Sequence, residues 1–142
     1  MDRISPQEAR ALMDQGWVYV DVRGEDEYGG GHPKGSLNVP LMLVGPSGRA
    51  PNPDFLPAIE ALFDKDSKLI LGCASGVRSA RAGEMLGKAG FGHLKDSRAG
   101  WFGARNAAGE VVEPGWLDAN LPAENGQPED RAWQALLKRL QG

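Results

Sequence analysis

The residues whose types and spacing could take part in a reaction lie around the only cysteine of this 142-residue chain. The segment reads Gly72-Cys73-Ala74-Ser75-Gly76-Val77-Arg78-Ser79. An apolar run precedes it and a helical pattern follows it, so the small residues predict a tight turn between a strand and a helix. Such a turn aims successive backbone N–H groups at one point, and the helix N-terminus adds a partial positive charge. The segment therefore predicts an anion site, in which the anion is the Cys73 thiolate or a group bonded to its sulfur.

Cys73 and Arg78 also have ordinary structural interpretations. A lone cysteine after an apolar strand is more often a small buried hydrophobe, but the neighbours of Cys73 favour a function. Arg78 either holds an incoming dianion or braces the loop through a carboxylate, and the sequence leaves both roles open. A merely solvated Arg78 is less favoured, because cations at a helix N-terminus need an anionic partner.

Strands and helices alternate across the first 105 residues. Buried strands are predicted at residues 17–22 and 68–72, a brief strand at 36–39, and a third central strand at 91–94. Helices are predicted from a capping box at residues 5–8, near 25–28, at 58–63 and at 78–88. This alternation predicts an α/β domain with a parallel sheet, whose ligands bind beyond the carboxyl ends of the strands, where Cys73 lies.

The remaining segments have a different composition. Residues 44–57 contain four prolines and are predicted to form a surface loop. Residues 1–105 are interpreted as the catalytic domain, and residues 106–142 as a loop followed by a short amphipathic helix at 131–140. Docking of this helix on the domain is favoured over binding to a partner.

Composition excludes several classes of function. The net charge is −3 without a basic stripe, so neither nucleic acid nor an anionic membrane is expected as a partner. No apolar run approaches the ~20 residues of a membrane span, and no secretory signal is visible. His32, His93 and one cysteine give no metal-ligand spacing, so no metal or cofactor is expected. The single cysteine agrees with a reducing compartment, and a cytoplasmic location is expected.

Two blocks of the sequence resemble rhodanese-like sulfurtransferase domains. The first comprises Val20-Asp21-Val22-Arg23, Glu27-Tyr28 and Gly31-His32-Pro33-Lys34-Gly35-Ser36-Leu37-Asn38-Val39-Pro40, and the second is the loop at residues 73–79. Gly90-Phe91 and Ala99-Gly100-Trp101 follow in the order typical of this family, so the resemblance covers roughly residues 4–105. Pro33-Lys34 and Ala99 depart slightly from the usual pattern, which affects turn geometry more than chemistry.

The resemblance implies a three-layer domain with about five mainly parallel strands and helices on both faces. It implies transfer of a sulfane sulfur from thiosulfate or a persulfide donor, through a Cys73 persulfide, to cyanide or a thiol, in some cases on an acceptor protein. Cys73 and Arg78 are the implied catalytic residues. The implied loop and supporting positions are Ala74, Ser75, Gly76, Val77 and Ser79, with Asp21, Arg23 and His32 around them.

Two alternatives accompany this interpretation. Dual-specificity phosphatases of the cell-cycle type are similar in fold, but have a histidine before the cysteine and five residues between cysteine and arginine. Here Gly72 precedes Cys73 and four residues intervene, which favours sulfur transfer. Non-catalytic rhodanese-like binding modules typically lack the cysteine, which this chain retains.

Overall fold

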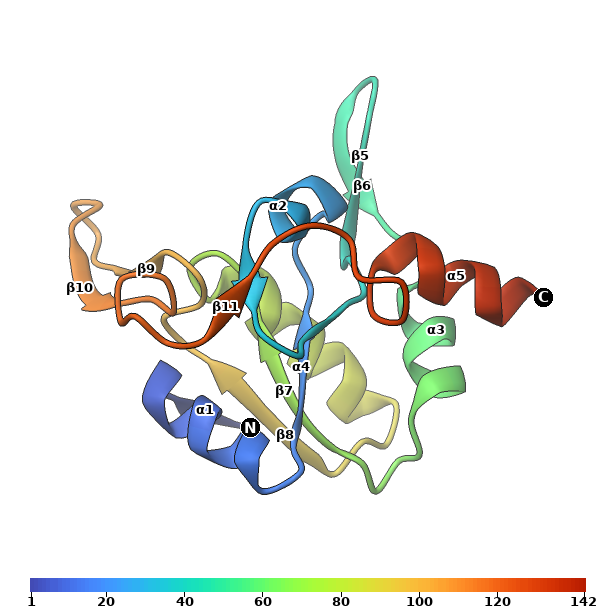
Figure 1. The fold of residues 1–142 in the computed structure, drawn as a ribbon, viewed down its shortest axis with the longest axis horizontal. Coiled ribbons are helices and arrows are strands. Elements are labelled where there is room, and N and C mark those ends of the chain that lie inside the picture. Colours follow the sequence, from blue (N-terminus) through green and yellow to red (C-terminus); the bar gives the residue numbers. More distant parts are fainter.

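A five-stranded parallel sheet forms the centre of the computed structural model, which describes residues 1–142 (Figure 1). Its strands, in spatial order, are β1 (Asp2–Ile4), β8 (His93–Ser97), β7 (Lys68–Gly72), β2 (Val18–Asp21) and β4 (Leu37–Asn38). The helices are α1 (Pro6–Asp14), α2 (Glu25–Gly29), α3 (Phe55–Leu62), α4 (Val77–Lys88) and α5 (Trp133–Gln141). The predicted α/β class with a parallel sheet is confirmed.

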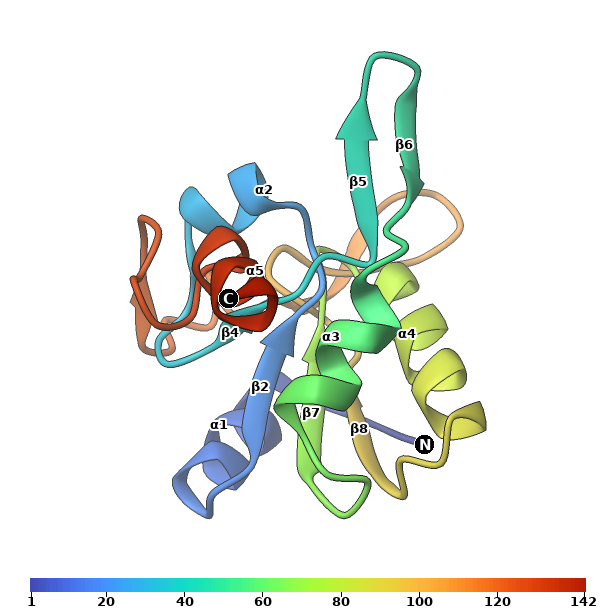
Figure 2. The ribbon, with the colours of Figure 1, turned by 90° about the vertical axis from the view of Figure 1, so that its right-hand side faces the viewer.

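Side chains alternate between two cores on the opposite faces of this sheet. Tyr19 and Ile70 pack with Ala9 of α1 on one face, whereas Val20 and Leu71 pack with α3, α4 and α5 on the other. Figures 1 and 2 show α1 on one side of the sheet and α3 and α4 on the other. Because both faces of β2 and β7 are covered, these strands are apolar without a polar alternation, as is typical of a parallel sheet.

The edge of the central sheet differs from the sequence-based expectation. The third strand was expected at residues 91–94, but β8 spans His93–Ser97, and β1 was not expected at all. Polar residues hide these strands in the sequence: Lys95 pairs with Asp2, and the buried Asp96 pairs with Arg3, across the β1–β8 ladder. These contacts join residues that are 93 positions apart, so no local sequence pattern predicts them.

Three strand pairs lie outside the central sheet. They are β5 (Met42–Gly45) with β6 (Gly48–Pro51), β9 (Gly103–Arg105) with β10 (Val111–Pro114), and β3 (His32–Pro33) with β11 (Ala123–Glu124). The β5–β6 hairpin corrects the prediction of a loop at residues 44–57, and β10 and β11 correct that of a loop at residues 106–128. Pro51 is compatible with β6 because it ends an edge strand, where a missing N–H leaves no ladder bond unmade.

The C-terminal helix lies against the same core as α3 and α4. Trp133 and Leu136 are fully buried in that core, whereas Leu140 is exposed at the end of the helix. The chain leading into α5 also contacts the sheet, because the Asn38 N–H donates to the Arg131 carbonyl. None of the helices has the length and apolar character needed to cross a membrane.

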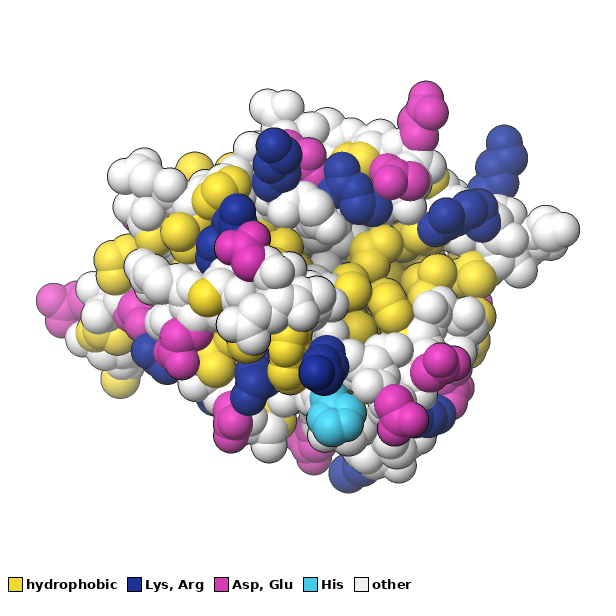
Figure 3. Space-filling view, turned by 60° about the horizontal axis from the view of Figure 1, so that its bottom comes forward, with side chains coloured by type: hydrophobic (Ala, Val, Ile, Leu, Met, Phe, Trp, Pro, Cys, Tyr) yellow, Lys and Arg dark blue, Asp and Glu magenta, His cyan; other side chains and the backbone are white.

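One face of the surface shows how charge is distributed. In Figure 3, acidic and basic side chains are interspersed around a shallow apolar hollow, and no continuous basic stripe is visible. This mixed surface is consistent with the small net charge of −3.

Candidate active site

Cys73 directly follows the carboxyl end of β7, in the turn that leads into α4. The residue before it has to be small, because a Cβ at position 72 would overlap the Tyr19 hydroxyl group. Gly76 caps α4 with a φ of 93°, in the left-handed region that favours glycine. The turn therefore places Cys73, which is 2% exposed, at the N-terminus of a twelve-residue helix.

The cysteine sulfur is held by donors from the turn and from the first helical residues. Cys73 Sγ accepts hydrogen bonds from the Gly76 N–H at 3.1 Å and the Ser79 N–H at 3.3 Å. The Ser79 hydroxyl lies 3.4 Å from Sγ, where it can accept from the thiol or donate to the thiolate. These groups favour negative charge on Sγ. The donors that the predicted anion site requires therefore lie around the cysteine sulfur.

The carbonyl groups of the turn are held on the opposite side. The Trp101 N–H donates to the Cys73 carbonyl at 2.8 Å, and the Phe102 N–H donates to the Ala74 carbonyl at 2.9 Å. Gly100 allows this close packing, because a Cβ there would overlap both carbonyl groups. Because the carbonyls of Cys73 and Ala74 accept hydrogen bonds on the side away from the sulfur, the N–H groups of Gly76 and Ser79 face Sγ.

Arg78 is tied to a carboxylate on another helix. Its Nη1 and Nη2 donate to the two carboxylate oxygens of Glu27 at 2.7 Å and 2.9 Å. These hydrogen bonds lower the pKa of Glu27 to about 2, although partial burial opposes the shift. This contact connects α4 with α2, as the bracing role of Arg78 requires.

Glu27 is the site residue that the sequence did not single out. Its carboxylate also accepts from the N–H of Gly24, the residue that caps α2, and lies 3.4 Å from Arg49 of the β5–β6 hairpin. An acidic residue in the first turn of a helix has an ordinary capping explanation, so its second role was hidden. Only the folded chain brings Glu27 to Arg78, 51 positions away.

Asp21 and Arg23 form a buried ion pair beside the site. Arg23 Nη2 lies 2.7 Å from Asp21 Oδ2 and also donates to the Gly31 carbonyl at 2.6 Å. The guanidinium stacks over Trp101, 5.3 Å from the ring centroid. Neither residue donates to Cys73, so both support the turn at Gly31 and the wall of the site.

His32 does not join the cysteine turn. Its buried ring stacks on Tyr28 with centroids 3.6 Å apart, and its nitrogens contact the Tyr28 carbonyl and Glu124. The predicted supporting role of His32 is therefore indirect, through the packing of α2 and the β3–β11 pair.

The other predicted loop residues make no hydrogen bond to the sulfur. Ala74 and Ser75 form the turn itself, and the Val77 side chain is exposed. No group of three or more His, Cys, Asp or Glu side chains is arranged to hold a metal ion. The arrangement supplies a buried nucleophile, main-chain donors and one braced arginine.

Comparisons with known proteins identify the family. The family described as "Rhodanese-like domain" matches residues 5–107. Thiosulfate sulfurtransferase 16, chloroplastic, of Arabidopsis thaliana is 41% identical over 98 residues, which cover 69% of this chain and 82% of that protein. Senescence-associated protein DIN1 of Raphanus sativus is also 41% identical over 116 residues, covering 82% of this chain but 57% of that protein.

A solved structure agrees with these relatives. The crystal structure of Rv0390 from M. tuberculosis superposes with a TM-score of 0.73 at 27% identity, covering 89% of this chain and 98% of that chain. The shared fold, the cysteine turn and the sequence relatives lead to one conclusion: this chain belongs to the rhodanese-like domain family.

Proposed function

We propose that this protein is a sulfurtransferase that moves a sulfane sulfur from thiosulfate, or from a persulfide donor, to cyanide or a thiol. The observation that carries the proposal is the pair of main-chain N–H groups, of Gly76 and Ser79, that donate to Cys73 Sγ. Such donors stabilise a thiolate, which is the nucleophile that this reaction needs.

The reaction has two balanced steps. In the first, the Cys73 thiolate attacks the outer sulfur of thiosulfate, a new S–S bond forms, and the S–S bond of the donor breaks to release sulfite with its electron pair. In the second, cyanide attacks the outer sulfur of the Cys73 persulfide, and thiocyanate leaves while the thiolate is restored. A thiolate acceptor reacts in the same way and departs as a persulfide. This double displacement predicts ping-pong kinetics.

The turn supports both steps by the same physical effect. Charge passes from Sγ to the outer sulfur during loading and returns during discharge, so donors that are already oriented lower the barrier without reorganisation. The first helical N–H groups have no partner within α4, which leaves donors beside the sulfur. Arg78 and Glu27 form an ion pair next to this helix end, and this pair joins the turn to α2.

Two features oppose the phosphatase alternative. A histidine before the cysteine cannot be accommodated, because even a Cβ at position 72 would overlap the Tyr19 hydroxyl. Arg78 also binds Glu27 with both terminal nitrogens, instead of standing over the turn to hold a phosphate. We therefore expect negligible hydrolysis of aryl phosphates, and robust hydrolysis would make the phosphatase the better interpretation.

The decisive experiment measures the intact mass of the protein after incubation with thiosulfate. We expect a gain of one sulfur atom on the wild type, its removal by cyanide, and stoichiometric formation of thiocyanate. Cys73→Ser is the matched control, because its hydroxyl occupies nearly the same space but forms no persulfide. A wild-type protein that gains no sulfur from thiosulfate or from a persulfide donor would contradict the proposal.

A further inference from the structure

The carbonyl of Gly76, the last residue of the cysteine turn, is held by a side chain. Arg3 Nη2 donates to the Gly76 carbonyl at 2.9 Å, whereas backbone N–H groups hold the carbonyls of Cys73 and Ala74. Arg3 lies in β1, before the family match begins at residue 5. The match to the family therefore says nothing about this contact.

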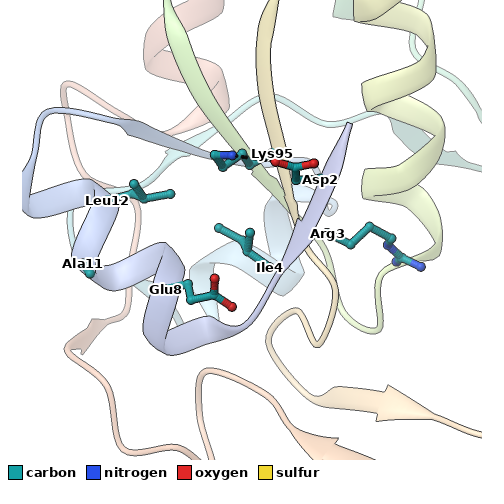
Figure 4. A pocket seen from close by; sticks show the side chains of 7 residues that line it. All are labelled: Asp2, Arg3, Ile4, Glu8, Ala11, Leu12 and Lys95. Atoms are coloured by element: carbon teal, nitrogen blue, oxygen red, sulfur yellow. Dashed lines mark hydrogen bonds and ion pairs between the residues drawn. The ribbon is translucent and has the colours of Figure 1, made fainter.

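β1 directs Arg3 toward the helix that begins at the cysteine turn. Figure 4 shows Arg3 and Ile4 leaving β1 on opposite sides, with Arg3 pointing toward α4 and Ile4 toward α1. The alternation of side chains along a strand explains this division. The hollow drawn there is lined by charges that are already partnered, Asp2 by Lys95 and Glu8 by Ser5, so we assign it no ligand.

Asp96 holds the Arg3 side chain in this position. Arg3 Nε donates to Asp96 Oδ2 at 2.6 Å, while the Asp96 carboxylate is completely buried and its other oxygen has no partner. The Arg3 side chain is half exposed, so burial alone would not fix its direction. The planar guanidinium donates through Nε to Asp96 Oδ2 and through Nη2 to the Gly76 carbonyl in one fixed geometry. The single, freely rotating ammonium group of a lysine does not reproduce that geometry.

The contact reaches the sulfur through one residue. Gly76 donates its N–H to Cys73 Sγ and accepts from Arg3 at its carbonyl, so Arg3 restrains the rotation of a residue that holds the nucleophile. Because C=O and N–H point in opposite directions across a planar trans peptide, fixing the Gly76 carbonyl also fixes the Val77 N–H. Gly76 has little restraint of its own, since its φ of 93° lies in a region that glycine enters and leaves freely.

We infer that Arg3 is a positioning residue for the sulfur transfer proposed above, acting through Gly76 to keep the N–H groups of the turn directed at Cys73. Asp96 orients Arg3 for this task. Arg3, which precedes the family match, thereby becomes a supporting residue of the cysteine turn.

The test measures alkylation of Cys73 by iodoacetamide as a function of pH. Because Cys73 is the only cysteine, the signal reports this site alone. Loss of Arg3 weakens the alignment of a donor to the thiolate, so Arg3→Ala should move the midpoint of the rate profile to higher pH. At pH 7 we expect alkylation about three- to tenfold slower, as for loss of roughly one hydrogen bond. Arg3→Lys should recover only part of the rate.

Matched variants separate positioning from stability. Arg3→Ala leaves the buried Asp96 carboxylate without its partner and could therefore destabilise the fold. The double variant Arg3→Ala/Asp96→Asn removes that buried charge. It decides the test if Arg3→Ala alone folds poorly. Asp2→Asn removes the neighbouring β1–β8 ion pair with Lys95, which does not touch the turn, and should leave the profile unchanged. An unchanged profile in the Arg3 variants, or an equal shift in Asp2→Asn, would overturn the inference.

The alkylation test of Arg3 can fail or succeed independently of the sulfur-loading test of the proposed function. Alkylation needs only the cysteine and its surroundings, so it reports on Arg3 whether or not the wild type accepts sulfur. Where the wild type accepts sulfur, persulfide formation should slow in the Arg3 variants by the same three- to tenfold factor as alkylation.

Discussion

Two arginine–carboxylate pairs flank the cysteine turn and differ in their origin and burial. Asp21 and Arg23 are two positions apart at the end of β2, and both side chains are at most 2% exposed. Glu27 and Arg78 come from separate helices, α2 and α4, with side chains 29% and 13% exposed. One arginine–carboxylate pair is therefore buried in the core, and the other is partly exposed at its edge.

The difference indicates separate roles for the two pairs. A fully buried pair cannot lose one partner without leaving a charge away from water, so Asp21 and Arg23 contribute chiefly to the integrity of the fold. A partly exposed pair can be broken at lower cost, because water reaches the remaining charge. Glu27 and Arg78 join α2 to the N-terminus of α4, so we expect this pair to affect sulfur transfer more than stability.

The largest expected effect concerns the nucleophile, Cys73, which lies at the N-terminus of α4, the helix that contains Arg78. Cys73→Ala should lower thiocyanate formation by about a thousandfold or more, because no persulfide forms without the sulfur. Its unfolding free energy should change far less than that of a variant in the buried pair. Steady-state assays with thiosulfate and cyanide, together with denaturant titration, check both parts. Wild-type turnover in Cys73→Ala would remove the cysteine from the mechanism.

The next largest effect concerns the buried pair. Arg23→Met should destabilise the protein by about 3–5 kcal/mol, because it leaves the Asp21 carboxylate buried without its partner. Asp21→Asn/Arg23→Met should recover part of this loss. As a control, Arg10→Ala breaks the exposed Arg10–Asp14 pair and should cost less than about 1 kcal/mol. Denaturant unfolding measures all three. A fully stable Arg23→Met protein that cannot transfer sulfur would reverse the roles given to the two pairs.

An intermediate effect is expected at the partly exposed pair. Arg78→Ala should lower the specificity constant for the sulfur donor by about tenfold, which corresponds to roughly 1.5 kcal/mol for a charged hydrogen bond. Glu27→Gln should act in the same direction, because it releases Arg78. Similar losses with thiosulfate and with an uncharged persulfide donor would support bracing. A loss confined to the dianion would instead show that Arg78 contacts the donor directly.

The smallest effect concerns acid stability. The pKa of Glu27 falls from 4.5 to about 2 because of its hydrogen bonds with Arg78, and the pKa of Glu124 falls equally because of Arg131. A lowered folded-state pKa contributes stability that is complete above pH 4.5 and is lost as the pH falls toward 2. Glu27→Gln and Glu124→Gln should each flatten the pH dependence of unfolding in this window.

Measurements of sulfur transfer distinguish the two carboxylates, which acid stability alone does not. Sulfur transfer should respond to Glu27→Gln but little to Glu124→Gln, since Glu124 contacts β3 and Arg131 rather than the cysteine turn. Equal losses of transfer in both variants would show that the effect comes from general loosening of the fold.

Short-range features were readable from the sequence because their causes are local. The strand–turn–helix around Cys73 follows from an apolar run, small residues with a glycine in the left-handed region, and a helical pattern. The capping box of Ser5 and Glu8 and the apolar strands β2 and β7 likewise follow from neighbouring residues. These local patterns already predicted the fold class and the anion site.

Other features depended on residues that are distant along the chain. The bond from Arg78 to Glu27 joins positions 51 apart, and that from Arg3 to Asp96 joins positions 93 apart. The sequence left two roles open for Arg78, because the bracing role depends on which carboxylate the packing of α2 brings within reach. Likewise, β1 contains two charged residues and becomes a strand only because β8 offers it a parallel edge. The backbone conformation of a short segment depends on its own residues, whereas the partner of a charged side chain depends on how the sheet and helices bring remote segments together.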